Sequence, residues 1–374
     1  MKIINNNPEA YPEKRNITLF GKDSIKYIED FFCYANKLKH KLTGKGNNLF
    51  YKGFFYSITD QKTPCHFFNC INLGKNSWVV TFETTLPRLG LASGFWYKRG
   101  VKQLVKPNCK KIIALSQCSF DRQVDYLQKN FPHLLNSIKE KMVVMHPPQK
   151  MLIQSYEEKK ISNKEVVFTI VGSDFFRKGG REVLSAFEAL IPQFPNLKLN
   201  IISDLVYGDY ASKTTIEDYH FAKKTIEDHH KNIFCYNGLS NSRVLEILQK
   251  SHVGLLPSWG DTYGYSVIEA QSAGCPVITT NIRAFPEINN NAIGWIIDVP
   301  LNQDKDADVD TLEKRAKFRT VLENGLVKII SDIMNGTSSI KEKGCLALER
   351  IKSDHSPEDH KAKLIDIYNK HFKS

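Results

Sequence analysis

The chain has 374 residues, of which 41% are hydrophobic and 25% are charged, and its formal net charge at pH 7 is +12. The chain is too long to form a single small domain and suits two domains of ordinary size. The composition excludes an intrinsically disordered chain. No apolar run approaches the ~20 residues that a transmembrane helix needs. The excess of Lys and Arg is typical of proteins that bind nucleic acid, a phosphorylated ligand or an anionic membrane surface. A chain rich in Lys and Asn is also basic through composition alone.

The cysteines and the N-terminal stretch indicate a compartment. The eight cysteines are scattered, and the nearest pair, Cys65 and Cys70, has no second pair to complete a metal site. The first residues, MKIINNNPEAYPEKRN, contain no apolar h-region of a secretory signal. We therefore expect a cytoplasmic protein whose thiols are reduced.

The first half of the chain mixes strand and helix patterns. Strands are predicted at 17–21, 53–59, 78–83, 111–116 and 142–146. The clearest helix is predicted from Ser24, because apolar residues from Ile25 to Leu42 recur at helical spacing and Ser24 suits an N-cap. Residues 147–164 begin with prolines and continue with polar and charged residues, so we expect a domain boundary in their middle.

The second half alternates more regularly. Strands are predicted at 165–172, 197–203, 232–238, 253–258, 276–281 and 294–298. Helices are predicted at 180–193, 242–251 and 265–273, with three more between 310 and 372. Short apolar strands that alternate with helices indicate parallel sheets covered on both faces, so the predicted fold class is α/β. In such open sheets, ligands bind beyond the carboxyl ends of the strands.

One basic loop follows the strand at 165–172. Gly172 closes this strand, and Arg177 and Lys178 stand just before two glycines and an amphipathic helix. A helix N-terminus offers free N–H groups and a partial positive charge, and two adjacent cations would complete a cradle for a diphosphate. The order of residues is neither a Walker A loop nor G-x-G-x-x-G. The alternative is a solvated βα loop that happens to be basic.

A second unusual segment, PSWGDTYGYSVIEAQSAGCPVITTN, joins two later strands. Here Asp261 stands in a turn rich in glycine, and a helix is expected to start near Gly264 or Tyr265. In one continuous helix, Asp261 and Glu269 would lie ~12 Å apart along the axis and could not share a face. With Asp261 in the turn and Glu269 in the helix, they can touch two parts of one long ligand. The alternatives are a helix N-cap for Asp261 and a surface position for Glu269.

These motifs resemble the retaining, nucleotide-sugar-dependent glycosyltransferases of the GT-B fold, called family 4 or group 1. The family pattern resembles PS-x-x-E-x-F-G-x-x-x-x-E-A-x-A-x-G-x-P-V followed by P-E, and this chain reads PSWGDTYGYSVIEAQSAGCPV followed by FPEI. The loop RKGG falls where the family has its diphosphate-contacting Arg and Lys. The resemblance covers about residues 165–300.

The resemblance implies a fold and an activity. It implies two Rossmann-like domains that face each other across a crevice, with a helical C-terminal tail. The acceptor domain would be 1–155, joined by the helix at 356–374, and the donor domain would be 156–355. It implies transfer of a sugar from a UDP- or GDP-sugar to an acceptor hydroxyl, with retention. No cofactor and no metal are expected, since the protein supplies the charges and we find no suitable Asp-x-Asp motif.

The resemblance also implies roles for single residues. Glu269 would bind the ribose hydroxyls, Asp261 would lie nearest the donor sugar, and Arg177 with Lys178 would neutralise the diphosphate. The family usually has Glu at the position of Asp261, which is one methylene longer and leaves the reach of Asp261 open. The other residues expected to contact the donor are Gly172, Ser173, Thr262, Tyr263, Gly264, Tyr265 and Ser266.

Candidates in the first half concern the acceptor, which would be a glycan, a glycolipid or a protein. Glu83 follows a strand and is a candidate catalytic base or acceptor contact, or else a solvated loop acid. Ser116 resembles the family's Ser before an acceptor-domain helix, and His146 is equally consistent with a structural role. The segment 93–106 mixes aromatic and basic residues, so it suits either peripheral contact with the inner face of a membrane or a helix with a buried aromatic face.

Two other functions remain open at this stage. A sugar-nucleotide epimerase on the same fold would need no acceptor. A basic protein that binds nucleic acid or a membrane would not need an acid-lined site at the ends of strands. The spacing of Asp261 and Glu269 favours the transferase, and nucleic acid is not an expected partner. Synthesis of a surface polysaccharide or another glycoconjugate is the expected setting.

Overall fold

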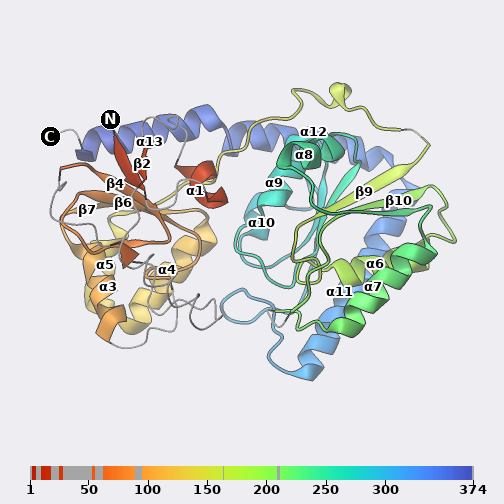
Figure 1. Ribbon diagram of the computed structural model, residues 1–374, viewed down its shortest axis with the longest axis horizontal. Helices are drawn as coiled ribbons and strands as arrows, with labels where there is room; N and C mark the ends of the chain where they lie inside the picture. The colour runs from red at the N-terminus through yellow and green to blue at the C-terminus, as the bar shows by residue number, and fades with distance from the viewer. Residues whose placement is uncertain are drawn as a thin grey trace. The chain divides into compact units, whose positions relative to one another are not determined.

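The computed structural model describes residues 2–5, 10–17, 25–27, 53–54, 62–88, 95–162, 164–208 and 211–372. The chain divides into two compact units. Unit 1 consists of Met1–Pro148 and His355–Ser374, and unit 2 consists of Gln149–Asp354. Each unit is an α/β domain in which helices cover a parallel sheet (Figure 1).

The division between the units comes before the boundary that the sequence suggested at 155/156. The side-chain amide of Gln149 donates to the hydroxyl of Ser272 over 3.1 Å. The backbone N–H of Leu152 donates to the carbonyl of Ser272 over 3.0 Å, and Ile153 packs with Tyr156 in an apolar cluster of unit 2. The segment from Gln149 onward therefore belongs to unit 2, because its hydrogen bonds and apolar contacts are made there.

The described residues of unit 1 form a six-stranded parallel sheet with the order β2-β1-β4-β6-β7-β8. Its strands are β1 Ile3–Asn5, β2 Ile25–Tyr27, β4 Cys65–Phe68, β6 Trp78–Phe82, β7 Cys109–Ala114 and β8 Met142–Val144. A second, two-stranded sheet pairs β3 Gly53–Phe54 with β5 Ile71–Asn72. The helices are α1 Tyr11–Asn16, α3 Phe95–Val105, α4 Gln117–Asn130, α5 Leu135–Lys139 and α13 Pro357–Phe372.

Both faces of the unit 1 sheet are buried. Val80 of β6 points into a core that includes Leu104 of α3 and Leu127 of α4. Its neighbour Val79 points to the opposite face, where Leu364 of α13 packs. Successive residues of a strand point to opposite faces, so a strand covered on both sides needs a continuous apolar run. This explains why WVVTF could be identified as a strand.

In unit 1, three predicted strands are present, whereas the clearest predicted helix begins as a strand. The strands predicted at 78–83, 111–116 and 142–146 are confirmed in β6, β7 and β8. The helix predicted from Ser24 is wrong at its start, because β2 pairs in parallel with β1, Ile25 opposite Ile3. The remainder of that helix lies outside the described residues, as do 18–21 and 55–59 of two predicted strands. The strand predicted at 17–21 is wrong at its first residue, because Ile17 is the C-cap of α1.

Unit 2 contains a second six-stranded parallel sheet among its described residues, with the order β11-β10-β9-β12-β13-β14. Its strands are β9 Val166–Val171, β10 Leu197–Ile202, β11 Ile233–Tyr236, β12 Val253–Leu256, β13 Val277–Thr280 and β14 Trp295–Ile297. The helices are α6 Gly180–Leu190, α7 Ile216–Asp228, α8 Asn241–Gln249, α9 Tyr265–Ser272, α10 Phe285–Ile288, α11 Leu312–Asn335 and α12 Ser338–Asp354. All six predicted strands of this half are confirmed.

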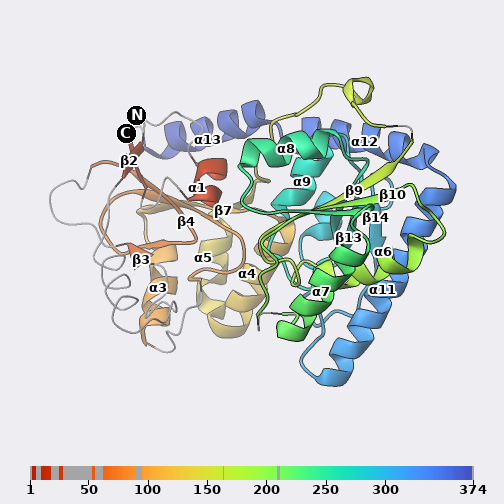
Figure 2. The same ribbon diagram turned by 45° about the vertical axis from the view of Figure 1, so that its right-hand side comes forward.

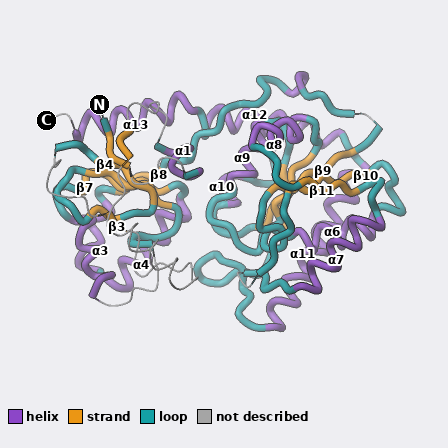
Figure 3. Tube along the Cα trace, in the orientation of Figure 1, coloured by secondary structure: helices purple, strands orange, loops and turns teal. Residues whose placement is uncertain are grey.

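The order of the unit 2 strands determines where its loops meet. From β9 the chain moves outward through β10 to β11, and it then returns to β12 on the other side of β9. Helices α6, α7 and α11 accordingly lie on one face of the sheet, and α8, α9 and α12 lie on the other (Figure 2). The point where the order reverses, between β9 and β12, is where ligands bind in open α/β sheets. Figure 3 shows that loops leave the sheet at both ends of its strands.

The C-terminal region forms the three predicted helices, α11, α12 and α13. The first two pack within unit 2, whereas α13 packs on the sheet of unit 1. Among the described residues, no helix has the length and apolar character needed to cross a bilayer.

Candidate functional site

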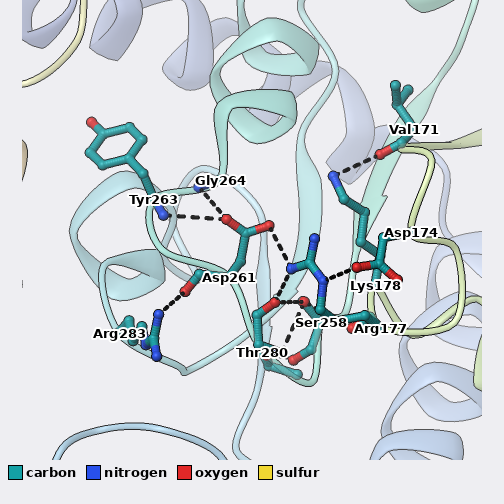
Figure 4. Close-up of polar contacts among 11 residues, drawn as sticks. Val171, Asp174, Arg177, Lys178, Ser258, Asp261, Tyr263, Gly264, Thr280 and Arg283 are labelled. Carbon is teal, nitrogen blue, oxygen red and sulfur yellow. Dashed lines mark hydrogen bonds and ion pairs between the residues drawn. The ribbon is translucent and has the colours of Figure 1, made fainter. Parts of the chain in front are cut away.

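The loops after β9 and β12 lie at the switch point of unit 2. These two strands are direct neighbours, with Phe168 opposite Val253. The first loop carries Arg177 and Lys178, and the second carries Asp261. The structure thus brings together three of the charged residues that the sequence singled out, although more than eighty positions separate the loops (Figure 4).

Lys178 is held against the end of β9. Its ammonium donates to the carbonyl of Val171 over 3.2 Å, and the side chain folds over Gly172, which has φ +148°. A Cβ at Gly172 would lie 2.4 Å from Cε of Lys178, so a larger residue here would displace the lysine from this position. Burial lowers the pKa of the Lys178 ammonium below its usual range, and the nearby Asp261 carboxylate opposes that shift.

Arg177 joins the two loops. Its Nε donates to Asp174 over 2.5 Å, and its Nη1 donates to the carbonyl of Gly260. The same Nη1 lies 3.7 Å from Oδ2 of Asp261, and Figure 4 shows the guanidinium pointing toward that carboxylate. A single cation therefore fixes the position of the loop that bears Asp261.

The backbones of the two loops also approach each other. Gly179, the N-cap of α6, has φ +82°. A Cβ at this position would lie 2.1 Å from the carbonyl oxygen of Pro257, the residue after the end of β12. The sequence suggested glycines for a phosphate cradle, and here Gly179 is also needed so that the two loops can touch.

Asp261 stands in the turn that precedes α9. Its Oδ1 accepts the backbone N–H groups of Tyr263, over 3.3 Å, and Gly264, over 3.1 Å. The N-cap of α9 is Gly264. Asp261 therefore fixes the turn and is not itself the N-cap, and its second carboxylate oxygen faces Arg177.

Glu269 lies within α9 and is 7% exposed. The alternative of a surface position for Glu269 is therefore wrong. The expected arrangement, with Asp261 in the turn and Glu269 in the helix, is confirmed. Between them in the sequence, the hydroxyl of Ser266 is buried and has no hydrogen-bond partner within the described part of the chain. A buried hydroxyl without a partner is uncommon, and a ligand would satisfy it.

The other predicted donor contacts surround the same helix start or the end of β9. Tyr263 is fully buried, and its ring centroid is 5.5 Å from that of Tyr265. Thr262 and Tyr265 are half-buried. Ser173 is exposed, and its carbonyl accepts the hydroxyl of Ser203 over 3.1 Å.

An ion pair with a buried carboxylate, which the sequence did not reveal, lies beside the loop of Asp261. Glu182 of α6 is 1% exposed, and its Oε1 lies 3.2 Å from Nε of Arg319 on α11. Burial raises the pKa of this carboxyl. The Arg319 guanidinium lies 6.0 Å from the ring centroid of Trp259, and that ring packs on Phe318 at 4.3 Å. Trp259 is two residues before Asp261, so α11 supports the loop.

Unit 1 holds the predicted acceptor residues. The carboxylate of Glu83 forms an ion pair with Arg88 and accepts the amide of Asn69 over 3.2 Å. Ser116 is buried and is the N-cap of α4, since its Oγ accepts the N–H of Ser119. The glutamate is thus a paired acid at the end of β6, and not a freely solvated one.

Two further unit 1 predictions have structural explanations. The carbonyl of His146 lies 3.0 Å from Nδ1 of His360 on α13, and the rings of His146 and His355 are 5.6 Å apart. The helix expected within 93–106 is α3, and the ring of Tyr97 is buried 5.5 Å from that of Tyr126. A helix with a buried aromatic face was one of the two alternatives for this segment, and it is confirmed for Tyr97.

The described residues contain no group of three or more His, Cys, Asp or Glu side chains placed to hold a metal ion.

Residues 153–325 match the family model of the glycosyl transferases group 1. This part of the chain is similar to the group 1 glycosyltransferase domain. It includes both loops of the switch point, and therefore Arg177, Lys178, Asp261 and Glu269. No curated protein matches the chain.

Solved structures show the same two-domain GT-B fold. WaaG, a glycosyltransferase involved in lipopolysaccharide biosynthesis, is 15% identical with a TM-score of 0.60, over 98% of this chain and 99% of WaaG. HepE from Anabaena, solved with UDP, is 10% identical with a TM-score of 0.61, over 99% of this chain and 100% of HepE. TarM is 15% identical with a TM-score of 0.53 over 82% of this chain, which spans only 55% of TarM. The predicted fold is therefore confirmed.

Proposed function

We propose that this protein transfers a sugar from a UDP- or GDP-sugar to an acceptor hydroxyl, with retention at the anomeric carbon. The observation that carries the proposal is the meeting of Arg177, Lys178 and Asp261 at the switch point of a group 1 glycosyltransferase domain. HepE, which shares the fold, was solved with UDP, and this supports a nucleoside diphosphate as the donor's leaving group.

In the proposed complex, the donor lies across the start of α9. Arg177 and Lys178 contact the diphosphate, Glu269 binds two ribose hydroxyls, and Asp261 faces the sugar. The unpartnered hydroxyl of Ser266 supports this placement, because it lies between the two carboxylates along the chain. The N–H groups of Tyr263 and Gly264 are held by Asp261, but the N-terminus of α9 still carries a partial positive charge that favours a phosphate.

Catalysis in this proposal consists of positioning and stabilisation of the leaving group. The C–O bond to the diphosphate breaks through an oxocarbenium-like transition state, and negative charge grows on the phosphate oxygens. Arg177 and Lys178 offset that charge. The pKa of Lys178 is lowered by burial in the free protein, and a bound diphosphate would oppose this shift and keep the ammonium charged.

We propose that no metal or other cofactor takes part in the reaction, because two cations of the chain are available for the diphosphate. No covalent nucleophile is assigned. Glu83 in unit 1 is proposed to contact the acceptor or to act as its base, and its support is its position at the carboxyl end of β6.

The acceptor is proposed to be a glycan, a glycolipid or a protein, in the synthesis of a surface polysaccharide or another glycoconjugate in the cytoplasm. WaaG acts in lipopolysaccharide biosynthesis, which supports this setting. Peripheral contact with a membrane would fit a lipid-linked acceptor, and the net charge of +12 is compatible with it.

The proposal is tested by a screen of UDP-, GDP- and ADP-sugars for thermal stabilisation, followed by product analysis by NMR. A donor at 100 times its Kd should stabilise the protein by about 2.7 kcal/mol. With an acceptor, the new glycosidic bond should have the anomeric configuration of the donor. A protein that no nucleotide sugar stabilises would contradict the proposal.

The same screen separates the alternatives. An epimerase would interconvert UDP-sugars when no acceptor is present, whereas the proposed transferase should only hydrolyse them slowly. Full activity in EDTA is expected, and loss of activity in EDTA would contradict the metal-independent reaction.

A further inference from the structure

Unit 1 contains a cavity that the proposed reaction does not use. Its volume is about 570 Å³, and its walls come from β7, β8 and the second half of α13. Cavities of this size commonly hold small molecules. The strand β8 is an edge of the unit 1 sheet, so the cavity lies beside that edge, on the face that α13 covers.

Three lysines and a histidine line the cavity. Lys111 comes from β7, and Lys363, Lys370 and His371 come from α13. Asp366 is the one carboxylate among the lining residues. Within the described part of the chain, none of these lysines forms an ion pair. The lining therefore carries an excess of positive charge that the described residues do not offset.

Lys111, Lys370 and His371 lie near enough to shift the pKa values of Lys111 and His371. Burial lowers the pKa of Lys111, and Lys370 lowers it further. Burial likewise lowers the pKa of His371, and Lys111, Lys370 and Lys110 add to this shift while Asp366 opposes it. An anion placed among these groups would relieve their repulsion.

The rest of the lining is apolar. Val143, Val144 and Met145 come from β8 and the residue that follows it, and Ile367 comes from α13. Val143 and Ile367 are only partly buried at the edge of the apolar core between the sheet and α13. A phosphate alone would leave this surface exposed to water, whereas a ligand with an apolar body would cover it.

We propose that this cavity binds an anionic amphiphile, with its phosphate group between Lys111, Lys370 and His371 and its apolar body along Val143 and Ile367. Such a phosphate ester has two sources, a soluble metabolite or a lipid in a bilayer. The proposal is independent of the donor site in unit 2, since every lining residue belongs to unit 1.

The test uses the full chain and dihexanoyl phosphatidic acid below its micelle concentration, with binding measured by calorimetry. Removal of two charge-assisted contacts in the variant Lys111→Gln/Lys370→Gln should weaken binding by about tenfold or more. The control is Lys129→Gln, an exposed lysine on α4, which covers the other face of the sheet. It should bind as the wild type does. Unchanged unfolding temperatures of the variants would show that the change is local.

Two comparison ligands test whether binding needs both the negative charge and the apolar body. Dihexanoyl phosphatidylcholine tests the charge, and inorganic phosphate tests the apolar body, and both should bind more weakly than the phosphatidic acid. No binding of the phosphatidic acid, equal binding of either comparison ligand, or an equal loss in Lys129→Gln would overturn the proposal.

Sedimentation with vesicles shows whether the phosphate ester comes from a bilayer or is a soluble metabolite. If a bilayer lipid is the ligand, vesicles with phosphatidic acid should carry the wild type down, and the double variant should stay in solution. If the ligand is soluble, only the monomeric amphiphile should bind. UDP binding should be equal in all variants, so a failure here is distinguishable from a failure of the proposed donor site.

Discussion

The two units have the same architecture, yet polar residues at the ends of their strands are held differently. In unit 1, Glu83 is paired with Arg88, and Ser116 serves as the cap of a helix. In unit 2, Lys178 contacts a backbone carbonyl, and the Ser266 hydroxyl has no partner among the described residues. The strand ends of unit 2 therefore have polar capacity left for a ligand, whereas the examples from unit 1 are satisfied by their own unit.

Replacement of Lys178 gives the strongest test of this difference. Lys178→Ala should lower kcat by about 10²–10³-fold, because a cation near the leaving group is lost. The matched control is Lys224→Ala, an exposed lysine on α7, which should keep the wild-type rate. Steady-state kinetics with the donor found in the screen would measure both, and equal rates in the two variants would remove Lys178 from the site.

Glu269→Gln should weaken donor binding, by a smaller factor than the loss of kcat expected for Lys178→Ala. The amide keeps the size of the side chain but loses the charge that accepts hydrogen bonds from ribose hydroxyls. We expect UDP to bind about tenfold more weakly, the cost of one charge-assisted hydrogen bond. In Glu83→Gln, UDP affinity should be unchanged because Glu83 belongs to unit 1. Titration calorimetry measures the UDP affinity of both variants. Weaker binding of UDP by Glu83→Gln would contradict the assignment of the donor site to unit 2 alone.

Acid should destabilise unit 1 through His66. This ring contacts the hydroxyls of Tyr368 on α13, at 2.5 Å, and Thr81 on β6, at 2.8 Å. Burial lowers its pKa from 6.5 to about 3, so between these pH values the unfolded chain holds a proton that the folded unit lacks. Stability should therefore fall by about 1.4 kcal/mol for each pH unit below 6.5.

The pH effect is measured by urea unfolding between pH 7 and pH 4, for the wild type and for His66→Gln. The variant should be less stable at pH 7 and should lose less stability on acidification. Other buried histidines, such as His252 and His360, also have a lowered pKa. The unfolding free energy of the variant should therefore still depend on pH, although less steeply. Identical slopes for the two proteins would contradict the role of His66.

Asp261→Glu should have the smallest effect and addresses the departure from the family pattern. The longer side chain keeps its charge opposite Arg177, so we expect kcat/KM to change by less than about fivefold, the value of one weak ion pair. Asp261→Asn, which removes the charge, should lower kcat/KM more. If Asp261→Glu were as damaging as Asp261→Asn, the length of Asp261 would matter as much as its charge.

Much of unit 2 could be predicted because its signals are local. The apolar runs of β9 and β12 are continuous, and the start of α9 follows directly from the turn around Asp261. Helix α7 was missed, although Thr215 and Asp218 form a capping box at its start. The pair of Glu182 and Arg319 could not be found in this way, because the residues are 137 positions apart and neither stands in a motif.

Unit 1 was harder to predict because its pairing is not local. Strand β1 has three residues, too few to show a period. The apolar residues after Ser24 recur at helical spacing, yet Ile25 begins a strand because β1 offers it backbone partners. The segment CHFF attracted attention for its cysteine, whereas Cys65 and Phe67 are core residues of β4.

The placement of α13 has a consequence for how the protein is made. A ribosome completes all of Gln149–Asp354 before it reaches the helix that covers Ile3, Val79 and Ile113 of the first sheet. Domains generally fold as they emerge, but here the N-terminal sheet must keep one apolar face uncovered until α13 arrives. Unit 2 can therefore complete its fold before unit 1 does.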